Sequence, residues 1–141
     1  FTGAGYTNEL WLQSPHLIHI ATGHETPEDT VVNLGTFSAN QELFFKMYVR
    51  DTGHHYYSGP AHRNPDNYIH AAISYLGDCE WLVGFEDMYN GGDQDFDDIL
   101  MVSDITMSHS IHFQITFHSA ANRRGLARLV LRSLAPWCNQ S

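Results

Sequence analysis

The chain has 141 residues, of which 43% are hydrophobic and 13% aromatic, and its formal net charge is -9. This length allows one domain with a buried core and is too short for two comfortable ones. The negative charge argues against general binding of nucleic acid or anionic membranes and leaves cations and neutral molecules as the better partners. No apolar run approaches the ~20 residues that span a bilayer, so no membrane insertion is expected.

Strand-like segments dominate the first two thirds of the chain. They are rich in β-branched and aromatic residues and have turn-forming residues between them. In chain order they are residues 31–37, 42–51, 68–76, 80–87 and 99–102. Gly77 and Asp78 separate two of these segments and predict a tight turn.

Hydrophobic and polar residues alternate most clearly along residues 105–118, which we interpret as one strand with a core face and a solvent face. The chain then becomes basic, and leucines at helical spacing between 126 and 134 predict a short C-terminal amphipathic helix. We therefore divide the chain into a β-sandwich domain, residues 1–118, and a basic tail, residues 119–141. The tail is either native or a non-native extension.

Turns rich in Gly, Pro, Asn and Asp recur about every ten residues, which is typical of all-β domains. The predicted fold is an antiparallel β-sandwich or jelly roll. Two cysteines, Cys79 and Cys138, allow at most one internal disulfide. The sequence leaves open whether they pair.

The segment GFEDMYNGGDQDFDD, residues 84–98, contains six carboxylates and no Lys or Arg. The six are Glu86, Asp87, Asp93, Asp95, Asp97 and Asp98. Two like charges about 5 Å apart repel by roughly 0.8 kcal/mol even in bulk water, so this segment needs solvent around each carboxylate or a cation among them. Because Ca²⁺ prefers six to eight oxygen ligands, carboxylates above all, we predict that these residues bind Ca²⁺.

Other interpretations of this segment remain. An EF-hand would need Gly at position 98 and Glu at position 104, where the chain has Asp98 and Asp104, and is therefore rejected. A solvated acidic turn without metal is one alternative. Another takes Glu86 and a second carboxylate as the acid and nucleophile of a glycosidase.

A second candidate site lies upstream, in residues 51–71. Tyr56, Tyr57 and Tyr68 occur there among Asn, Asp and His side chains, a composition that suits stacking on carbohydrate and hydrogen bonding to it. The alternative is that these tyrosines are core and turn residues.

Several blocks of the chain, over about residues 1–104, resemble a bacterial domain of unknown function, DUF4114. They are FTGAGYTNELWL, TPEDTVVNLGTF, ELFFKMYVRDTGHHYYSGPAHRNPDNYIHA and LVGFEDMYNGGDQDFDDILM. The most specific block is G-F-E-D followed by G-G-D-x-D-F-D-D. The resemblance implies a calcium-binding β-sandwich without established catalytic activity, found in bacterial proteins secreted with a PEP-CTERM sorting tail and in large calcium-rich adhesins.

The resemblance also assigns residues to sites. The six carboxylates of residues 84–98 match the acidic motif of the family. Asn64, Asp66 and His70 match its upstream N-P-D and H-A element. Together with Tyr57 these three residues are the candidate ligand-binding set.

We therefore expect a secreted, extracellular bacterial module that binds Ca²⁺ and uses residues 54–68 for binding or adhesion. Its ligand would be a glycan or a cell-surface or extracellular protein, and no nucleic acid. The alternative function is a small carbohydrate-active hydrolase that uses Glu86 and an aspartate of the acidic segment.

Overall fold

The computed structural model describes residues 5–38, 40–107 and 111–117. One sheet, sheet A, contains β1 (Asn8–Ser14), β2 (Ile18–Thr22), β4 (Phe44–Val49) and β5 (His54–Tyr57). The other, sheet B, contains β3 (Val31–Phe37), β6 (Ala71–Gly77), β7 (Glu80–Phe85), β8 (Ile99–Met107) and β9 (Ile111–Phe117). Two short 3-10 helices, η1 (Ala61–Arg63) and η2 (Tyr89–Gly91), lie in the loops.

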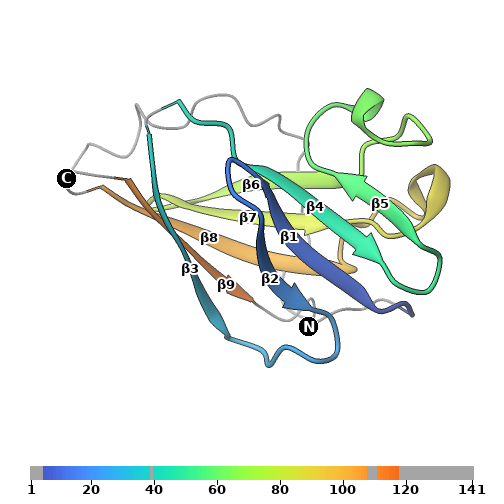
Figure 1. Cartoon of the computed structure of the whole chain (residues 1–141), viewed down its shortest axis with the longest axis horizontal. Helices are drawn as coiled ribbons and strands as arrows, with labels where there is room; N and C mark the ends of the chain where they lie inside the picture. Colours follow the sequence, from blue (N-terminus) through green and yellow to red (C-terminus); the bar gives the residue numbers. More distant parts are fainter. Residues whose placement is uncertain (1–4, 39, 108–110, 118–141) are drawn as a thin grey trace.

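The two sheets face each other as the layers of a sandwich (Figure 1). The strand order is β2-β1-β4-β5 in sheet A and β3-β9-β8-β7-β6 in sheet B, and every strand pair is antiparallel. Within the described residues no helix is longer than the three residues of η1 or η2. The predicted all-β, antiparallel fold class is confirmed.

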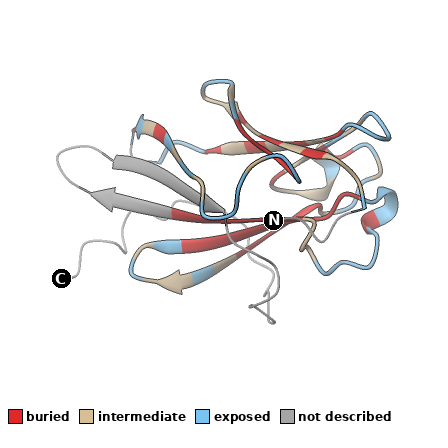
Figure 2. Ribbon diagram, turned by 90° about the horizontal axis from the view of Figure 1, so that it is seen from below, coloured by how far each residue is buried: buried red, intermediate tan, exposed pale blue. Residues whose placement is uncertain are grey.

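The core lies between the sheets, where buried residues of both layers meet (Figure 2). Side chains alternate across a strand, so every second residue of β4 points inward: Phe45, Met47 and Val49 are buried and their neighbours are not. β7 differs because both of its faces are buried. Its residue Leu82 belongs to a second apolar cluster, on the opposite side of sheet B from the main core.

The expectation of one strand over residues 105–118 is wrong. β8 ends at Met107 and β9 begins at Ile111, and these two residues are register partners in an antiparallel pair. Paired positions share a face of the sheet, and 107 and 111 are an even number of residues apart. The alternation of hydrophobic and polar residues therefore continues unbroken through the β8–β9 connection, and the sequence pattern does not reveal where the connection lies.

The predicted tight turn at Gly77 and Asp78 is present between β6 and β7, where Asp78 and Cys79 adopt positive φ angles of 48° and 65°. Cys79 is not a free thiol. Cys138 and the predicted helix in residues 119–141 lie outside the described residues. None of the helices in the described ranges is long and apolar enough to span a membrane.

The different burial of two leucines generates a prediction about stability. Leu10 is fully buried in the core, whereas Leu17, in the β1–β2 connection, is 62% exposed. Leu10→Ala should lower the free energy of unfolding by about 2–5 kcal/mol in urea titrations, because it leaves a cavity. Leu17→Ala should change it by less than about 0.5 kcal/mol. Equal effects of the two changes would contradict the described core.

Candidate metal centre

The acidic loop, residues 86–98, connects β7 to β8 and is closed at its base. Phe85 and Ile99 are register partners, so the chain leaves and re-enters sheet B at adjacent positions. The Asp98 N–H donates to the Phe85 carbonyl at 3.1 Å. The Asp87 N–H donates to the Asp98 carboxylate at 2.8 Å. Acidic residues at both ends of the loop are thereby held next to each other.

The path of the loop requires left-handed backbone, which glycine accepts easily and other residues adopt less often. Asn90, Gly91, Gly92, Gln94 and Phe96 all have positive φ angles, between 45° and 78°. At Gly92 an added Cβ would lie 2.2 Å from Glu86 Oε1, so the backbone wraps closely around that carboxylate. The same loop folds back over β7.

Two groups of carboxylates that could hold a metal ion result from this path, and Glu86 belongs to both. The first group is Glu86, Asp87 and Asp98, and the second is Glu86, Asp93 and Asp95. In each group one oxygen per residue lies within 4.8 Å of the others. Glu86 and Asp87 are buried, at 1% and 3% exposure, whereas Asp93 and Asp95 are exposed.

Five of the six carboxylates predicted as metal ligands are therefore brought together. Asp97 belongs to neither group; its backbone N–H donates to Asp95 Oδ1 at 3.2 Å. The D-x-D-x-D spacing thus brings only two of its three carboxylates into a possible metal group. The other members come from the two ends of the loop.

Burial of the first group has a clear electrostatic consequence. Burial, together with the charges of Asp93 and Asp87, raises the pKa of Glu86 to about 7, although N–H donors from Met88 and Gln94 oppose the shift. Burial likewise raises the pKa of Asp98 to about 8, and the nearby Asp87 and Glu86 carboxylates contribute.

Burial also raises the pKa of Asp87, although a hydrogen bond from Asn8 opposes this. Among the described residues, no Lys or Arg forms an ion pair with Glu86, Asp87 or Asp98. Three converging carboxylates without a basic partner cannot all remain ionised at low cost. They must bind protons or a cation.

Two of the candidate ligand-binding residues connect the β5–β6 loop, residues 58–70, to the acidic loop. The Asp66 carboxylate accepts from His70 Nε2 at 2.9 Å and from the Asn90 N–H at 2.7 Å. His70 Nδ1 lies 2.7 Å from the Glu86 carbonyl oxygen. The His70 ring therefore bridges the Asp66 carboxylate and the Glu86 backbone.

Although burial opposes it, the hydrogen bonds from His70 and two backbone N–H groups lower the pKa of Asp66. The side chains of Asp66 and His70 are fully buried. The two loops are therefore one connected unit, and they lie at the same end of the sandwich, at the right in Figure 1.

The other two candidate ligand-binding residues differ in position. Asn64 is buried, and its amide pairs with backbone atoms of Tyr57 and Tyr68, so it holds the β5–β6 loop in shape. Tyr57 lies at the end of β5 with its ring stacked on that of Phe44, 5.3 Å between centroids. The set predicted from the sequence is therefore divided between an internal hydrogen-bond network and the outer surface of sheet A.

Two residues of sheet A reach this end of the sandwich: Asn8, which sequence reasoning missed, and Tyr56, which it gave as a carbohydrate-stacking ring or a core residue. Asn8 is fully buried and donates to Asp87 Oδ2 at 2.7 Å, and Tyr56 stacks on His70 with 3.7 Å between ring centroids. Among the described residues, Asn8 Oδ1 and the Tyr56 hydroxyl have no hydrogen-bond partner. The sequence does contain a sign of the burial of Asn8. Side chains alternate along a strand, so residue 8 points to the same side as the buried Leu10 and Leu12.

The raised pKa values predict how the stability of metal-free protein depends on pH. A carboxyl whose pKa is higher in the folded state than in the unfolded state favours folding less as pH rises between the two values. These windows run from 4.5 to about 7 for Glu86 and from 3.8 to about 8 for Asp98.

In the presence of EDTA, the free energy of unfolding from urea titrations should therefore fall by a few kcal/mol between pH 5 and pH 8. Glu86→Gln should flatten this dependence because it removes one of the titrating groups. An unfolding free energy that rises over the same range would contradict the described burial.

Gly84 provides a test of the loop path. An added Cβ at this residue would lie 2.2 Å from the Phe96 carbonyl oxygen, whereas at Gly5 it would meet nothing within 4 Å. Gly84→Ala should displace the acidic loop and lower the free energy of unfolding by about 1–3 kcal/mol in urea titrations, as overpacking does. Gly5→Ala is the matched control and should be close to neutral. If Gly84→Ala is also neutral, the loop does not cross β7 as described.

The comparisons with known proteins give one match. The model of the domain of unknown function DUF4114 matches residues 29–106, more than half of the chain and including the whole acidic loop. No curated protein and no solved structure matches. The chain belongs to the DUF4114 family of domains.

Proposed function

We propose that this domain is an extracellular, calcium-stabilised β-sandwich that acts as a binding or adhesion module. The observation that carries the proposal is the convergence of Glu86, Asp87 and Asp98, largely buried and without a basic partner among the described residues. A divalent cation would replace the protons that these groups otherwise need, and would remove the repulsion between them.

The donor set suits calcium. Every potential ligand is an oxygen, and hard oxygen ligands favour Ca²⁺, Mg²⁺ or Mn²⁺ over metals that prefer nitrogen or sulfur. Ca²⁺ binds at 2.3–2.6 Å, so two ligands of one ion are at most about 5 Å apart, and the oxygens of each group lie within 4.8 Å of one another. Asn8 adds a neutral amide next to Asp87, a ligand type that Ca²⁺ also accepts.

A cation at this position would stabilise the contact between the two sheets. Asn8 belongs to β1 of sheet A, whereas Asp87 follows β7 of sheet B, and the two side chains are hydrogen bonded. Tyr56 and His70 make a second contact between the layers. Because metal binding would occur only in the folded state, its free energy would appear as folding stability.

The proposed binding role depends on the two loops that the metal would hold in place. The acidic loop is joined to the β5–β6 loop through Asp66 and His70, so a cation that fixes one loop would also fix the other. Tyr68 and Tyr89, from these two loops, are 43% and 49% exposed and would be available to a ligand. A glycan or an extracellular protein is the proposed class of partner.

The extracellular location is part of the proposal and follows from the metal. Calcium sites of extracellular modules are weak, because external Ca²⁺ is abundant, and they need no dedicated high-affinity loop. The excess of carboxylates over basic residues is consistent with such a setting. The family resemblance to secreted bacterial proteins supports the same proposal.

The alternative of a carbohydrate-active hydrolase receives less support. A catalytic acid or nucleophile must touch its substrate, and Glu86 is only 1% exposed. Its two carboxylate oxygens already accept from Met88 and Gln94. These features fit an internal ligand better than a reactive group.

The metal proposal predicts a selective thermal shift. After EDTA treatment, Ca²⁺ at about 100 times its dissociation constant should stabilise the fold by about 2.7 kcal/mol. For a domain of this size that raises Tm by roughly 5–10 °C, and Mg²⁺ should raise it less. An unchanged Tm, together with no metal in elemental analysis of the untreated protein, would contradict the proposal.

Two variants test where the cation binds. Glu86→Gln should lose most of the Ca²⁺-dependent shift while remaining folded in EDTA, because it removes a buried charge. Glu80→Gln is the matched control, since Glu80 is exposed at the other end of β7, and should keep the full shift. A Glu86→Gln protein that keeps the Ca²⁺ shift but loses turnover in a glycosidase screen would instead support the hydrolase.

A further inference from the structure

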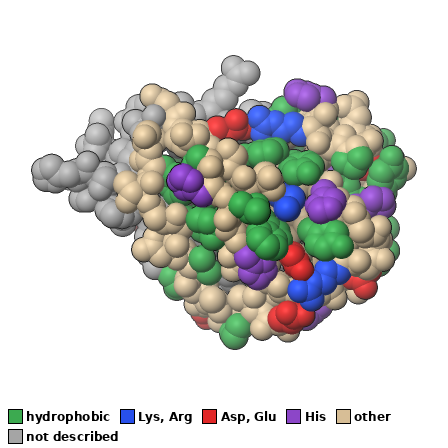
Figure 3. Space-filling model, viewed as in Figure 1, with side chains coloured by type: hydrophobic (Ala, Val, Ile, Leu, Met, Phe, Trp, Pro, Cys, Tyr) green, Lys and Arg blue, Asp and Glu red, His purple; other side chains and the backbone are tan. Residues whose placement is uncertain are grey.

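The outward face of sheet A has an unusual composition. The outward positions of β1, β4 and β5 contain only aromatic rings and polar or charged side chains, with no aliphatic residue. These positions are Glu9, Trp11, Gln13, Phe44, Lys46, Tyr48, His55 and Tyr57. Figure 3 views the molecule from this side and shows hydrophobic, basic and histidine side chains mixed across it.

One row of this face crosses the whole sheet. His19 pairs with Trp11, Trp11 with Lys46, and Lys46 with Tyr57, so four neighbouring strands each contribute one side chain. The Lys46 ammonium lies 5.2 Å from the centroid of the Trp11 ring. Trp11 and Tyr57 are two strand spacings apart, which is about 10 Å.

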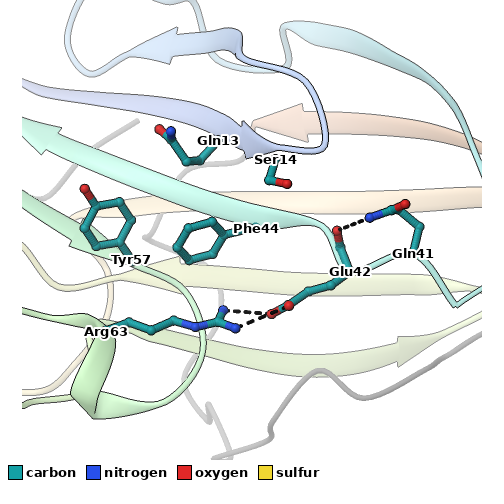
Figure 4. A pocket seen from close by; sticks show the side chains of 7 residues that line it. All are labelled: Gln13, Ser14, Gln41, Glu42, Phe44, Tyr57 and Arg63. Atoms are coloured by element: carbon teal, nitrogen blue, oxygen red, sulfur yellow. Dashed lines mark hydrogen bonds and ion pairs between the residues drawn. The ribbon is translucent and has the colours of Figure 1, made fainter.

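A hollow of about 440 Å³ lies at one end of this face, between β1, β4 and the β5–β6 loop (Figure 4). The stacked rings of Phe44 and Tyr57 line it, and the Arg63 guanidinium lies 4.7 Å from the centroid of the Phe44 ring. Arg63 is also paired with Glu42 at 2.7 Å. Tyr57 and Arg63 both lie over the Phe44 ring, so Tyr57 is the ring of this pair that can offer a face to a ligand, beside hydrogen-bonding groups.

Gln13 lines the same hollow. Among the described residues, its Oε1 is a buried acceptor without a hydrogen-bond partner. That atom is enclosed by protein, so it could accept from a bound molecule only after the Gln13 side chain turns toward the hollow, which would also relieve the free-energy cost of an unmet acceptor.

The charges on this face are balanced. Arg63 is paired with Glu42, and Arg50 with Glu9 and Glu25. With a net charge of -9 on the whole chain, no excess of positive charge is available here to attract an anionic polymer. A neutral ligand is the better match.

We propose that the outward face of sheet A binds a neutral polysaccharide, with sugar rings stacked on Trp11 and on Tyr57. A pyranose ring has an apolar C–H face and a rim of hydroxyl groups, which match half-buried rings flanked by amide, carboxylate and guanidinium groups. The inference deepens the proposed binding function and rests on it, but it uses a surface distinct from the acidic loop.

Affinity electrophoresis in native gels tests the proposal with galactomannan, xyloglucan and mixed-linkage β-glucan as neutral polymers and alginate as an anionic one. At least one neutral polymer should retard the protein, and alginate should not. Retardation by none of the neutral polymers, or by alginate alone, would overturn the proposal.

Variants locate the binding surface. Trp11→Ala and Tyr57→Ala should each weaken the association by about tenfold, as the loss of one stacking ring implies. Tyr57→Phe keeps the ring and should retain binding. Tyr75→Ala is the matched control, because Tyr75 is a 54% exposed tyrosine on sheet B, and should bind normally. Unchanged binding by folded Trp11→Ala and Tyr57→Ala proteins would overturn the assignment to this face.

Thermal melts of the same preparations with and without Ca²⁺ separate the two proposals. A protein that responds to Ca²⁺ but binds no neutral polymer refutes the polysaccharide surface alone. A protein that binds a neutral polymer without any response to Ca²⁺ leaves this surface standing and refutes the calcium site alone.

Discussion

Buried negative charge at one end of the sandwich is the constraint on which the described arrangement depends. Glu86 and Asp87 leave β7 and enter the protein rather than the solvent, and the loop returns Asp98 beside them. Such a cluster is costly unless protons or a cation neutralise it. The close packing of Gly92 against Glu86 and the positive φ angles of the loop are the means by which the chain maintains this geometry.

The same end of the molecule connects its parts. Asn8 reaches Asp87 from sheet A, and Asp66 and His70 reach the acidic loop from the β5–β6 loop. Because of these contacts, protonation of the acidic cluster or metal binding to it would affect sheet A and the β5–β6 loop as well as the acidic loop. Extracellular calcium would then act as a condition for rigidity, while a separate aromatic surface on sheet A would provide recognition.

Much of the fold and part of the site could be predicted from the sequence. Alternation and turn residues indicated an all-β protein, and the charge density of residues 84–98 indicated the acidic cluster. Alternation could not locate the β8–β9 connection, because the parity is the same on both sides of it. Nor could spacing show that Asp97 stays outside both carboxylate groups, since this depends on the path of the whole loop, which has left-handed backbone at Gln94 and Phe96. Asn8, far away in the sequence, meets Asp87 only through the packing of the two sheets.

The most direct test of the central claim is calorimetric titration of chelated protein with Ca²⁺ at pH 7 in buffers of different ionisation enthalpy. If Ca²⁺ replaces protons on Glu86 and Asp98, saturable binding should be accompanied by release of protons to the buffer, and the release should decrease at higher pH. Saturable binding without proton release, or no binding at millimolar Ca²⁺, would contradict the account.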